Sequence, residues 1–278
     1  MDNKQPPKFI QPTDSRARWL KSLEQREARR YFKSGFTKHD LLIGALLRGA
    51  LYLIAARAGI GKTAYLFSFA YRQILAGVRV YFCNLEMPVE QMWNRLACLH
   101  DPDLTLRELN ESQMTPERQA YFGRLAQELE SFSPLFFEST DFAALATAAR
   151  TEIKPSSDSI LCLDYVGLLS MRGLRPEQRY WLISESAKQL KVLARDLDIP
   201  IVATVQLNRD IEKRKEKTPM LADLRDSGEL ENNADAVFAL TREDREILEV
   251  DALKNRHGPL GSYSLRFDGP RCAVEDYK

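Results

Sequence analysis

The chain has 278 residues, 44% of them hydrophobic, and its formal net charge at pH 7 is +1. This length and composition predict a soluble, globular chain with one large domain or two small ones and a substantial core. A charge this close to neutral excludes a global electrostatic attraction to nucleic acid, so any DNA site has to be local.

The apolar segments and the cysteines bear on cellular location. The longest apolar stretches are of strand length, well short of the roughly 18 to 20 residues of a membrane-spanning helix. The N-terminus is rich in proline and polar residues and has no hydrophobic signal region. The cysteines form no CxxC pair, and we interpret them as small core residues: Cys83, Cys98, Cys162 and Cys272. These features predict a cytoplasmic protein without a membrane partner.

The N-terminal part has two segments. Residues 1–14 are expected to be an extended lead-in without periodicity. Residues 15–32 carry a helical apolar stripe that a short helix cannot bury alone. This helix either packs on its own domain or docks onto another subunit or a partner. We place a boundary near Gly35, which separates an N-terminal extension, residues 1–34 with a helix at about 15–33, from a main domain, residues 35–278.

From Gly35 onward, short apolar segments alternate with helical patterns, which predicts an α/β fold with a mostly parallel sheet covered on both faces. The parallel strands are expected at Leu51–Ala56, Val78–Asn84, Leu135–Glu138, Ser159–Leu163 and Ile199–Val205. The helices are expected at Thr63–Leu75, Val89–Leu99, Pro116–Ser131 with Thr115 as its cap, Phe142–Ile153 and Tyr180–Leu197. Later strands are expected at Ala236–Thr241, Glu249–Leu253, Tyr263–Phe267 and Cys272–Glu275, with a hairpin at Asp268-Gly269.

The segment from Leu51 to Tyr65 predicts a strand, a phosphate-binding loop and a helix. Backbone N–H groups in a loop of small residues converge on an anion, and the positive end of the helix dipole favours phosphate there. Lys62 is expected to reach the β- and γ-phosphates, and Thr63 to help hold Mg²⁺. The general motif has Gly where this chain has Ala56, so the alternative is an ordinary strand-to-helix turn. The residues expected to contact the nucleotide are Arg57, Ala58, Gly59, Ile60, Gly61, Lys62, Thr63 and Ala64.

Two carboxylates follow expected strands. In a phosphate-loop fold, Asp164 lies beside Thr63 and orients the Mg²⁺ shell, although an apolar run ending in Asp is common by itself. Glu86 is expected at the carboxyl edge of the sheet, where open α/β sheets place their ligands. A carboxylate there polarises the water that attacks the γ-phosphate. Alternatively, Glu86 is a helix N-terminal carboxylate favoured by the dipole.

Two further polar groups end strands. A neutral amide at Gln206 can contact the γ-phosphate and lose that contact on hydrolysis, as a sensor does. Lys254 and Arg256, at i and i+2, point the same way and can both reach one polyanion. Unless a neighbouring subunit supplies the phosphate, these two cations belong to an exposed basic turn.

In their order and spacing, these motifs resemble those of the DnaB-type replicative helicases. The matching segments are Ser34 to Thr37, Ala55 to Thr63, Phe82 to Met87, Leu163 to Tyr165, Gln206 to Arg209, Asp223 to Glu231 and Lys254 to Pro259. The resemblance extends from about Gly35 to the C-terminus. That family also carries Ala at the position of Ala56.

The resemblance implies a RecA-like motor that assembles as a ring, usually a hexamer, and holds ATP and Mg²⁺ between subunits. It implies that Glu86 is the catalytic base and that Gln206 senses the γ-phosphate. Lys62 and Thr63 match the residues that bind phosphates and Mg²⁺, and Asp164 matches the acid that orients Mg²⁺. Lys254 and Arg256 match the basic residues inserted into the neighbour's ATP site, where a cation supplied in trans stabilises transition-state charge.

The resemblance also implies binding to single-stranded DNA. Arg225, Asp226 and Gly228 match the family's central DNA-binding loop, which contacts phosphates and is therefore insensitive to sequence. The segment that begins at Arg209 either lines the same channel or is a solvated loop. Residues 15–32 look like the family's linker helix, while the family's N-terminal collar domain is not represented. Primase binding and ordinary loader recruitment are therefore in question, and a helicase loader or initiator protein is a candidate partner.

The expected function is that of a ring-forming, ATP-dependent DNA helicase that translocates on single-stranded DNA and unwinds duplex DNA during replication. Its source is expected to be a phage, a plasmid or another mobile element, or a host-type helicase reduced to its motor. The alternative is a RecA-like ATPase that acts as an accessory, loader or inhibitor of another replicative helicase. A recombination or clock-type ATPase is disfavoured by the segments Asp223 to Glu231 and Lys254 to Pro259.

Overall fold

One nine-stranded sheet, in the order β3-β2-β4-β5-β1-β6-β7-β8-β9, organises the described part of the computed structural model. The structure describes residues 31–111, 114–131, 135–173, 175–214, 218–224 and 228–277, together with residues 12, 13, 15–17 and 20. The strands are β1 (Leu51–Ala56), β2 (Arg79–Asn84), β3 (Leu135–Phe137), β4 (Ser159–Asp164), β5 (Ile201–Gln206), β6 (Ala236–Thr241), β7 (Ile247–Asn255), β8 (Ser262–Asp268) and β9 (Ala273–Glu275).

Helices connect these strands. The α-helices are α2 (Thr37–Leu42), α3 (Lys62–Leu75), α4 (Val89–His100), α5 (Leu106–Glu111), α6 (Pro116–Ser131), α7 (Phe142–Glu152), α8 (Arg179–Leu197) and α9 (Gly228–Asn233). Short 3₁₀ turns are η1 (Val166–Leu168), η2 (Pro176–Gln178), η3 (Arg209–Lys213) and η4 (Leu221–Asp223). The helices expected after Gly35 are all present with ends shifted by a residue or so. The Thr115 hydroxyl accepts a hydrogen bond from the Arg118 N–H at 3.3 Å, as a cap does. The sequence analysis missed the short helices α2 and α5.

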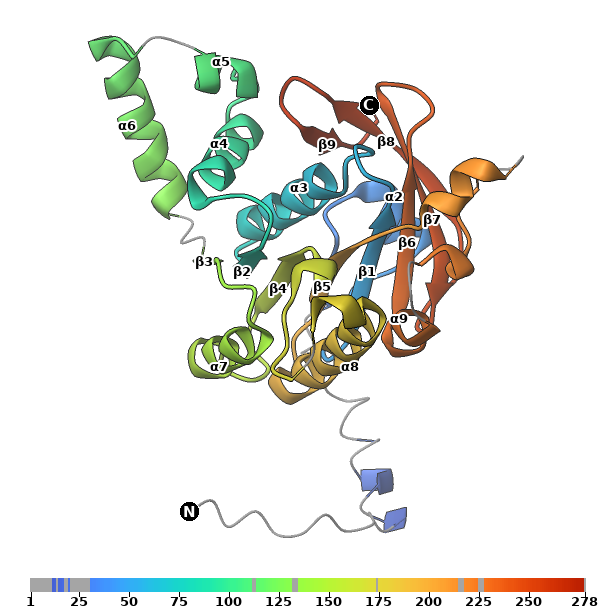
Figure 1. Ribbon diagram of the computed structural model, residues 1–278. Coiled ribbons are helices and arrows are strands. Elements are labelled where there is room, and N and C mark those ends of the chain that lie inside the picture. The colour runs from blue at the N-terminus through green and yellow to red at the C-terminus, as the bar shows by residue number, and fades with distance from the viewer. Residues whose placement is uncertain are drawn as a thin grey trace. The chain divides into compact units, whose positions relative to one another are not determined.

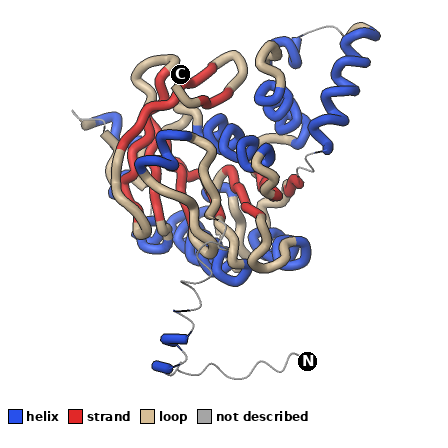
Figure 2. Tube along the Cα trace, turned by 180° about the vertical axis from the view of Figure 1, so that it is seen from behind, coloured by secondary structure: helices blue, strands red, loops and turns tan. Residues whose placement is uncertain are grey.

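In the order of the sheet, the six strands β3, β2, β4, β5, β1 and β6 run parallel to one another. Strands β7, β8 and β9 continue the sheet, each antiparallel to the strand before it. Helices α3 and α4 cover one face and α7 and α8 the other (Figures 1 and 2). Alternate β1 residues serve the two faces: Tyr52 and Ile54 pack in the cluster with α3, and Leu51 and Leu53 in the cluster with α8. The predicted two-faced, mostly parallel sheet is thus confirmed, as is the β8–β9 hairpin.

The chain divides into two compact units, Met1–Tyr31 and Phe32–Lys278. Most of the expected N-terminal helix lies outside the described residues, and its role as a linker stays a prediction. Its expected end is wrong, because Phe32 pairs with Leu46 in a β-bridge instead of continuing a helix. The Phe32 ring is buried in the core with the Arg48 guanidinium 5.0 Å from its centroid, and this packing outweighs the local helical pattern.

The cysteines occupy the positions expected of small apolar residues. Cys83, Cys98 and Cys162 are buried, and Cys272 is half-buried. Burial raises the pKa of the Cys83 thiol to about 12, which disfavours the reactive thiolate. Within the described residues, none of the helices combines the length and apolar character needed to cross a bilayer.

Candidate functional site

The loop between β1 and α3 depends on two glycines. Gly59 and Gly61 have φ angles of 77° and 125°, in the left-handed region that favours glycine. Ala56, in contrast, still pairs with Gln206 of β5 as a strand residue. An extended residue does not require a positive φ, so the structure explains why Ala is tolerated where the general motif has Gly.

Gly61 also lies close to β8. A Cβ at Gly61 would lie 2.9 Å from Cε2 of Phe267, whereas a Cβ at Gly59 would meet nothing within 4 Å. The helix that follows, α3, has 14 residues, and its first N–H groups lack partners within the helix. The loop therefore presents amides and a helix N-terminus toward the carboxyl edge of the sheet.

The hydroxyl of Thr63 and the carboxylate of Asp164 meet at this edge. Thr63 Oγ1 donates to Asp164 Oδ2 at 2.6 Å. Thr204, on the intervening strand β5, donates to Asp164 Oδ1. Asp164 is fully buried, so two hydroxyl groups fix its orientation and satisfy both of its oxygens.

Opposing effects act on the pKa of Lys62. Burial lowers the pKa of its ammonium, the carboxylates of Asp164 and Glu86 raise that pKa, and Arg57 lowers it; the net shift is downward. Both predicted carboxylates therefore act on the predicted phosphate-binding lysine.

The turn after β2 orients Glu86. The buried Asn84 accepts hydrogen bonds at its Oδ1 from the N–H of Glu86 at 3.1 Å and of Met87 at 3.4 Å. Asn84 is in register with Asp164, and the N–H of Leu85 donates to the Asp164 carbonyl at 2.8 Å. Glu86 itself is exposed, so its carboxylate faces solvent beside the buried Asp164.

Gln206 completes the group of residues at the carboxyl edge. It ends β5 in register with Ala56 and is half-buried. The structure thus gathers Lys62, Thr63, Asp164, Glu86 and Gln206 around the ends of four parallel strands. This is the edge where open α/β sheets bind ligands.

Arg57 ties the loop to η3. Its guanidinium contacts Glu212 Oε1 at 2.9 and 2.6 Å and donates to the Leu207 carbonyl at 2.9 Å. Arg57 was predicted to contact the nucleotide, and its pairing with Glu212 was not expected from the sequence. Within one chain, its guanidinium is engaged by protein groups.

A cavity of about 720 Å³ adjoins the loop, with Ala58 and Ile60 on one side and the segment after β6 on the other. Arg242 donates to the Gly59 carbonyl at 3.0 Å, and its guanidinium lies 4.1 Å from the centroid of the Phe267 ring. Neither Arg242 nor Phe267 is among the site residues predicted from the sequence. They lie far from the loop in sequence, and only the placement of β6 and β8 brings them to it.

Lys254 and Arg256 lie at the other end of the strands, level with the start of β1. Lys254 is in register with Val237, near the start of β6, and β6 begins level with Tyr52 at the start of β1. The two ends of the six-residue β1 are roughly 17 Å apart. The structure therefore does not bring these cations to Lys62 of the same chain.

Carbonyl groups of α9 hold both cations. Lys254 Nζ donates to the Glu231 carbonyl, and Arg256 Nη2 donates to the Asn232 carbonyl at 2.6 Å. Burial, followed by the neighbouring Arg256, lowers the pKa of Lys254. Carbonyls at a helix C-terminus carry partial negative charge, so this anchoring suits two cations.

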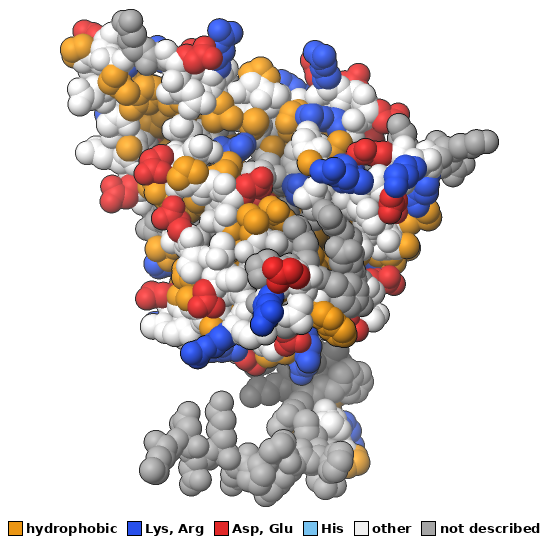
Figure 3. Space-filling model, viewed as in Figure 1, with side chains coloured by type: hydrophobic (Ala, Val, Ile, Leu, Met, Phe, Trp, Pro, Cys, Tyr) orange, Lys and Arg blue, Asp and Glu red, His pale blue; other side chains and the backbone are white. Residues whose placement is uncertain are grey.

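The predicted DNA contacts are only partly described. Arg225 and Asp226 lie outside the described residues. Gly228 begins α9, and Arg209 begins η3; both are exposed. On the face drawn in Figure 3, acidic and basic side chains are interspersed, in keeping with the net charge of +1.

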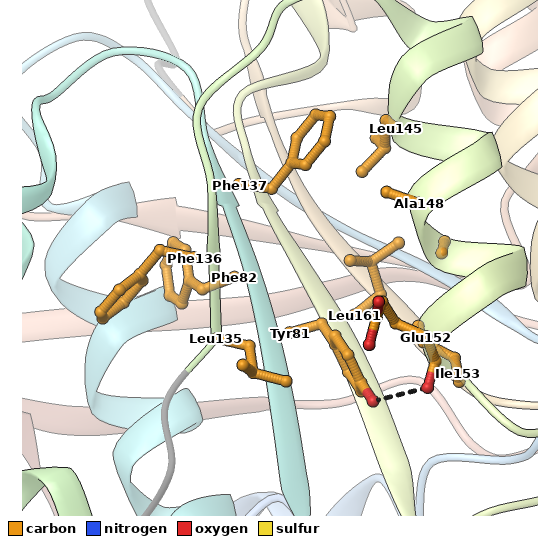
Figure 4. Close-up of a pocket in the computed structure, with 11 residues that line it drawn as sticks. Tyr81, Phe82, Leu135, Phe136, Phe137, Leu145, Ala148, Glu152, Ile153 and Leu161 are labelled. Atoms are coloured by element: carbon orange, nitrogen blue, oxygen red, sulfur yellow. Dashed lines mark hydrogen bonds between the residues drawn. The ribbon is translucent and has the colours of Figure 1, made fainter.

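A separate cavity of about 150 Å³ lies between β2, β3 and α7, near the edge of the sheet (Figure 4). Its wall is mainly apolar and includes Phe137, Leu145 and Leu161. The Tyr81 hydroxyl donates to the Glu152 carbonyl at 3.1 Å across its rim. This lining lacks the polar groups of the strand ends described above.

Comparison of the chain with known proteins identifies its family. Residues 32–276 match the sequence model of the DnaB-like helicase C terminal domain. The chain belongs to this family. It is 31% identical over 248 residues to the replicative DNA helicase DnaB of Geobacillus stearothermophilus, covering 84% of this chain and 54% of that protein. It is 33% identical over 253 residues to a probable plasmid replicative DNA helicase of Chlamydia psittaci, covering 84% and 52%.

Solved structures share the fold. A DnaB-like replicative helicase, solved in a study of its interactions with primase, gives a TM-score of 0.82 at 26% identity, covering 98% of this chain and 68% of that one. An ATPase domain solved on its own superposes with a TM-score of 0.85 at 26% identity, covering 98% of this chain and all of that domain. These likenesses confirm the expected RecA-like fold. The chain spans about half the length of the curated relatives it matches.

Proposed function

We propose that this chain is the motor of a ring-forming, ATP-dependent DNA helicase that translocates on single-stranded DNA and unwinds duplex DNA during replication. The observation that carries the proposal is the 2.6 Å hydrogen bond from Thr63 to Asp164 beside Lys62. The DnaB-like relatives support the same class of function. A mobile-element source rests on one of them, the probable plasmid replicative helicase.

The oxygen donors at the edge fit Mg²⁺ bound with ATP. Mg²⁺ at nucleotide sites takes one or two protein oxygens and completes its shell with phosphates and water. The Thr63 hydroxyl and the Asp164 carboxylate are oxygens of this kind. When bound there, Mg²⁺ neutralises charge that develops on the phosphates. Among the described residues, no three His, Cys, Asp or Glu side chains cluster as a self-sufficient metal site.

Each side chain at the edge has a proposed task in ATP hydrolysis. Lys62 and the loop amides bind the phosphates. Glu86, exposed and oriented by Asn84, accepts a proton from the attacking water. Gln206, at the end of β5, contacts the γ-phosphate through its amide and loses this contact after hydrolysis.

The cavity beside the loop is proposed to receive the nucleoside. Arg242 lines this cavity and donates to the Gly59 carbonyl, and its guanidinium lies over the buried Phe267 ring next to Gly61. Planar cations and aromatic rings stack favourably on a base. A base in the cavity would stack on the face of the Arg242 guanidinium that does not lie on Phe267.

A complete ATP site is proposed to need two subunits. Lys254 and Arg256 lie too far along the sheet to reach the phosphate loop of their own chain. A neighbour in a ring receives them, and there they stabilise the charge of the transition state. A hexamer accords with the family resemblance described above.

DNA binding is proposed to use Arg225, Asp226 and Gly228, with Arg209 as a further phosphate contact. Gly228 directly starts α9, whose last carbonyls hold the two cations. DNA contact and the cations offered to the neighbour are thus separated by one short helix.

The function is tested by strand separation with the variant Glu86→Gln. We expect ATP turnover to fall roughly 10²- to 10⁴-fold, because a general base contributes on this order. Unwinding should be lost and nucleotide binding retained. Glu90→Gln, an exposed acid in the first turn of α4, is the matched control and should retain activity. Wild-type ATP turnover and unwinding in Glu86→Gln would contradict the assignment.

A further inference from the structure

The buried carboxylate of Asp235 lies where α9 leads into β6. Its side chain is 4% exposed, and the residue stands directly before Ala236, the first residue of β6. None of the tasks proposed above involves it. Because a buried carboxylate is costly unless charges or hydrogen bonds compensate for it, its partners indicate its role.

One oxygen of Asp235 is tied to the start of β1 and to α8. Oδ2 accepts hydrogen bonds from the Leu51 N–H at 2.8 Å and from Lys191 Nζ at 2.7 Å. Lys191 also donates to the Gly49 carbonyl at 2.7 Å. Burial opposes ionisation of Asp235, but the hydrogen bonds from Lys191 and the Leu51 amide outweigh it, and the net effect lowers the pKa of this carboxyl.

The other oxygen faces the turn that carries the cations. Oδ1 lies 3.9 Å from Arg256 Nη1 and 3.4 Å from His257 Nε2. The Asp235 carbonyl accepts a hydrogen bond from the Arg256 N–H at 2.8 Å. Asp235 therefore holds both the backbone and the guanidinium of Arg256, while the Asn232 carbonyl holds the remaining end of that guanidinium.

We propose that Asp235 is a positioning residue that aims Arg256 at the ATP site of the neighbouring subunit and ties this arginine to β1 of its own subunit. The inference rests on the proposed function, in which Arg256 acts in trans. The proposal amounts to a rigid connection between two ATP sites. Strand β1 ends in the phosphate loop of one site, and the start of β1, through Asp235, holds Arg256, which serves the next site.

The connection makes a directional prediction. Asp235 lies at the start of β1 and so is remote from the phosphate loop of its own chain. A defect at Asp235 should leave nucleotide binding by its own subunit intact and impair hydrolysis next door. A residue that merely supports the fold would instead impair its own site.

Mixed rings separate these two outcomes. Asp235→Asn keeps the size of the side chain and removes its charge, and nucleotide binding and thermal unfolding report on its fold. In homomeric rings we expect ATP turnover to fall roughly 10- to 100-fold, because a shift of about 1 Å in a catalytic group costs up to about 10²-fold. Mixing with Lys62→Ala subunits, which lack a working site and supply an intact Arg256, should restore turnover.

Two further mixtures provide the controls. Asp235→Asn with Arg256→Ala should show no recovery, since both variants lack the same donated group. Lys62→Ala with Arg256→Ala should recover activity and establishes that sites are shared. Recovery in this control without recovery of Asp235→Asn by Lys62→Ala would overturn the role of Asp235. No recovery in the control would instead refute the shared site of the proposed function.

A second variant covers the case in which Asp235→Asn does not fold. Lys191→Gln removes the ammonium that holds Oδ2 and leaves Asp235 in place. It should behave in the same mixtures as Asp235→Asn does, with recovery by Lys62→Ala and none by Arg256→Ala. Recovery when mixed with Arg256→Ala, or wild-type turnover in homomeric rings of Lys191→Gln, would overturn the inference.

Discussion

The hydroxyl of Thr63 and the carboxylate of Asp164, 101 positions apart in the chain, are joined by a hydrogen bond of 2.6 Å. One group lies in the first turn of α3 and the other ends β4, and Thr204 of β5 donates to the second carboxylate oxygen. The contact sets the oxygens proposed to face Mg²⁺ before any nucleotide binds. Its disruption should therefore affect catalysis more than folding.

Substitution of Thr63 tests this contact. We expect Thr63→Ala to lower ATP turnover roughly 10- to 100-fold, as losses in the surroundings of a metal commonly do. Thr63→Ser, which keeps the hydroxyl, should remain within severalfold of wild type. Steady-state ATPase assays across Mg²⁺ concentrations measure the effect, and equal activity of the two variants would show that the hydroxyl is dispensable.

The two glycines of the loop form a matched pair for stability. Gly59→Ala meets open space and bears only the left-handed φ, for about 1 to 2 kcal/mol of destabilisation. Gly61→Ala adds an overlap with the Phe267 ring, and overpacking costs about 1 to 3 kcal/mol more. Chemical denaturation should give a lower free energy of unfolding for Gly61→Ala than for Gly59→Ala. The reverse order would contradict the close approach of the loop to β8.

The proposed nucleoside contact predicts a selective loss of affinity. Arg242→Ala should weaken ATP binding roughly 5- to 30-fold, equivalent to about 1 to 2 kcal/mol of stacking on a base. Binding of tripolyphosphate, which has no base, should change little. Arg245→Ala, an exposed arginine nearby, is the control. Calorimetry with both ligands measures the effect, and equal losses for the two ligands would assign Arg242 to the phosphates.

His39 predicts a decrease in stability in mild acid. Burial lowers the pKa of His39 to about 4 from 6.5, the nearby Asp40 opposes the shift, and Nδ1 lies 2.7 Å from the Tyr263 hydroxyl. Between these two pKa values the unfolded chain binds a proton that the folded chain does not. The free energy of unfolding should therefore fall as the pH drops from 6.5 toward 4, by on the order of 3 kcal/mol.

Urea denaturation of wild type and His39→Gln at several pH values measures this dependence. The glutamine cannot take up a proton in this range, so the variant should lose less stability than wild type between pH 6.5 and 4.5. Parallel curves for the two proteins would show that His39 does not cause the acid sensitivity.

The salt dependence of binding to single-stranded DNA tests the proposed channel. Two phosphate contacts per subunit in a ring of six should give a log-log slope of about −8, since single strands contribute about −0.7 per contact. Arg225→Ala should reduce this slope to about −4. A wild-type slope near −1 would be incompatible with a ring that grips the strand from every subunit.

Much of the fold follows from local sequence patterns. The buried parallel strands have continuous apolar runs and the longer helices between them have apolar stripes, so their bounds follow from the sequence to within a residue or two. The residues that end β2, β4 and β5 also meet at one edge, because parallel strands place their carboxyl ends together. Glu86, Asp164 and Gln206 could therefore be proposed without a structure.

The remaining features depend on contacts between segments distant in sequence. Arg242 and Phe267 reach the phosphate loop only because β6 and β8 are placed in the same sheet, and no local pattern records that pairing. Asp235 carries no local signal, and its role follows from its contacts with β1, α8 and the turn at Arg256. The sequence by itself determined which side chains end which strands, since that depends on local periodicity. The tertiary structure alone decided that Arg256 lies at the end of the strands opposite its own nucleotide loop, because the direction of β7 follows from its antiparallel pairing with β6.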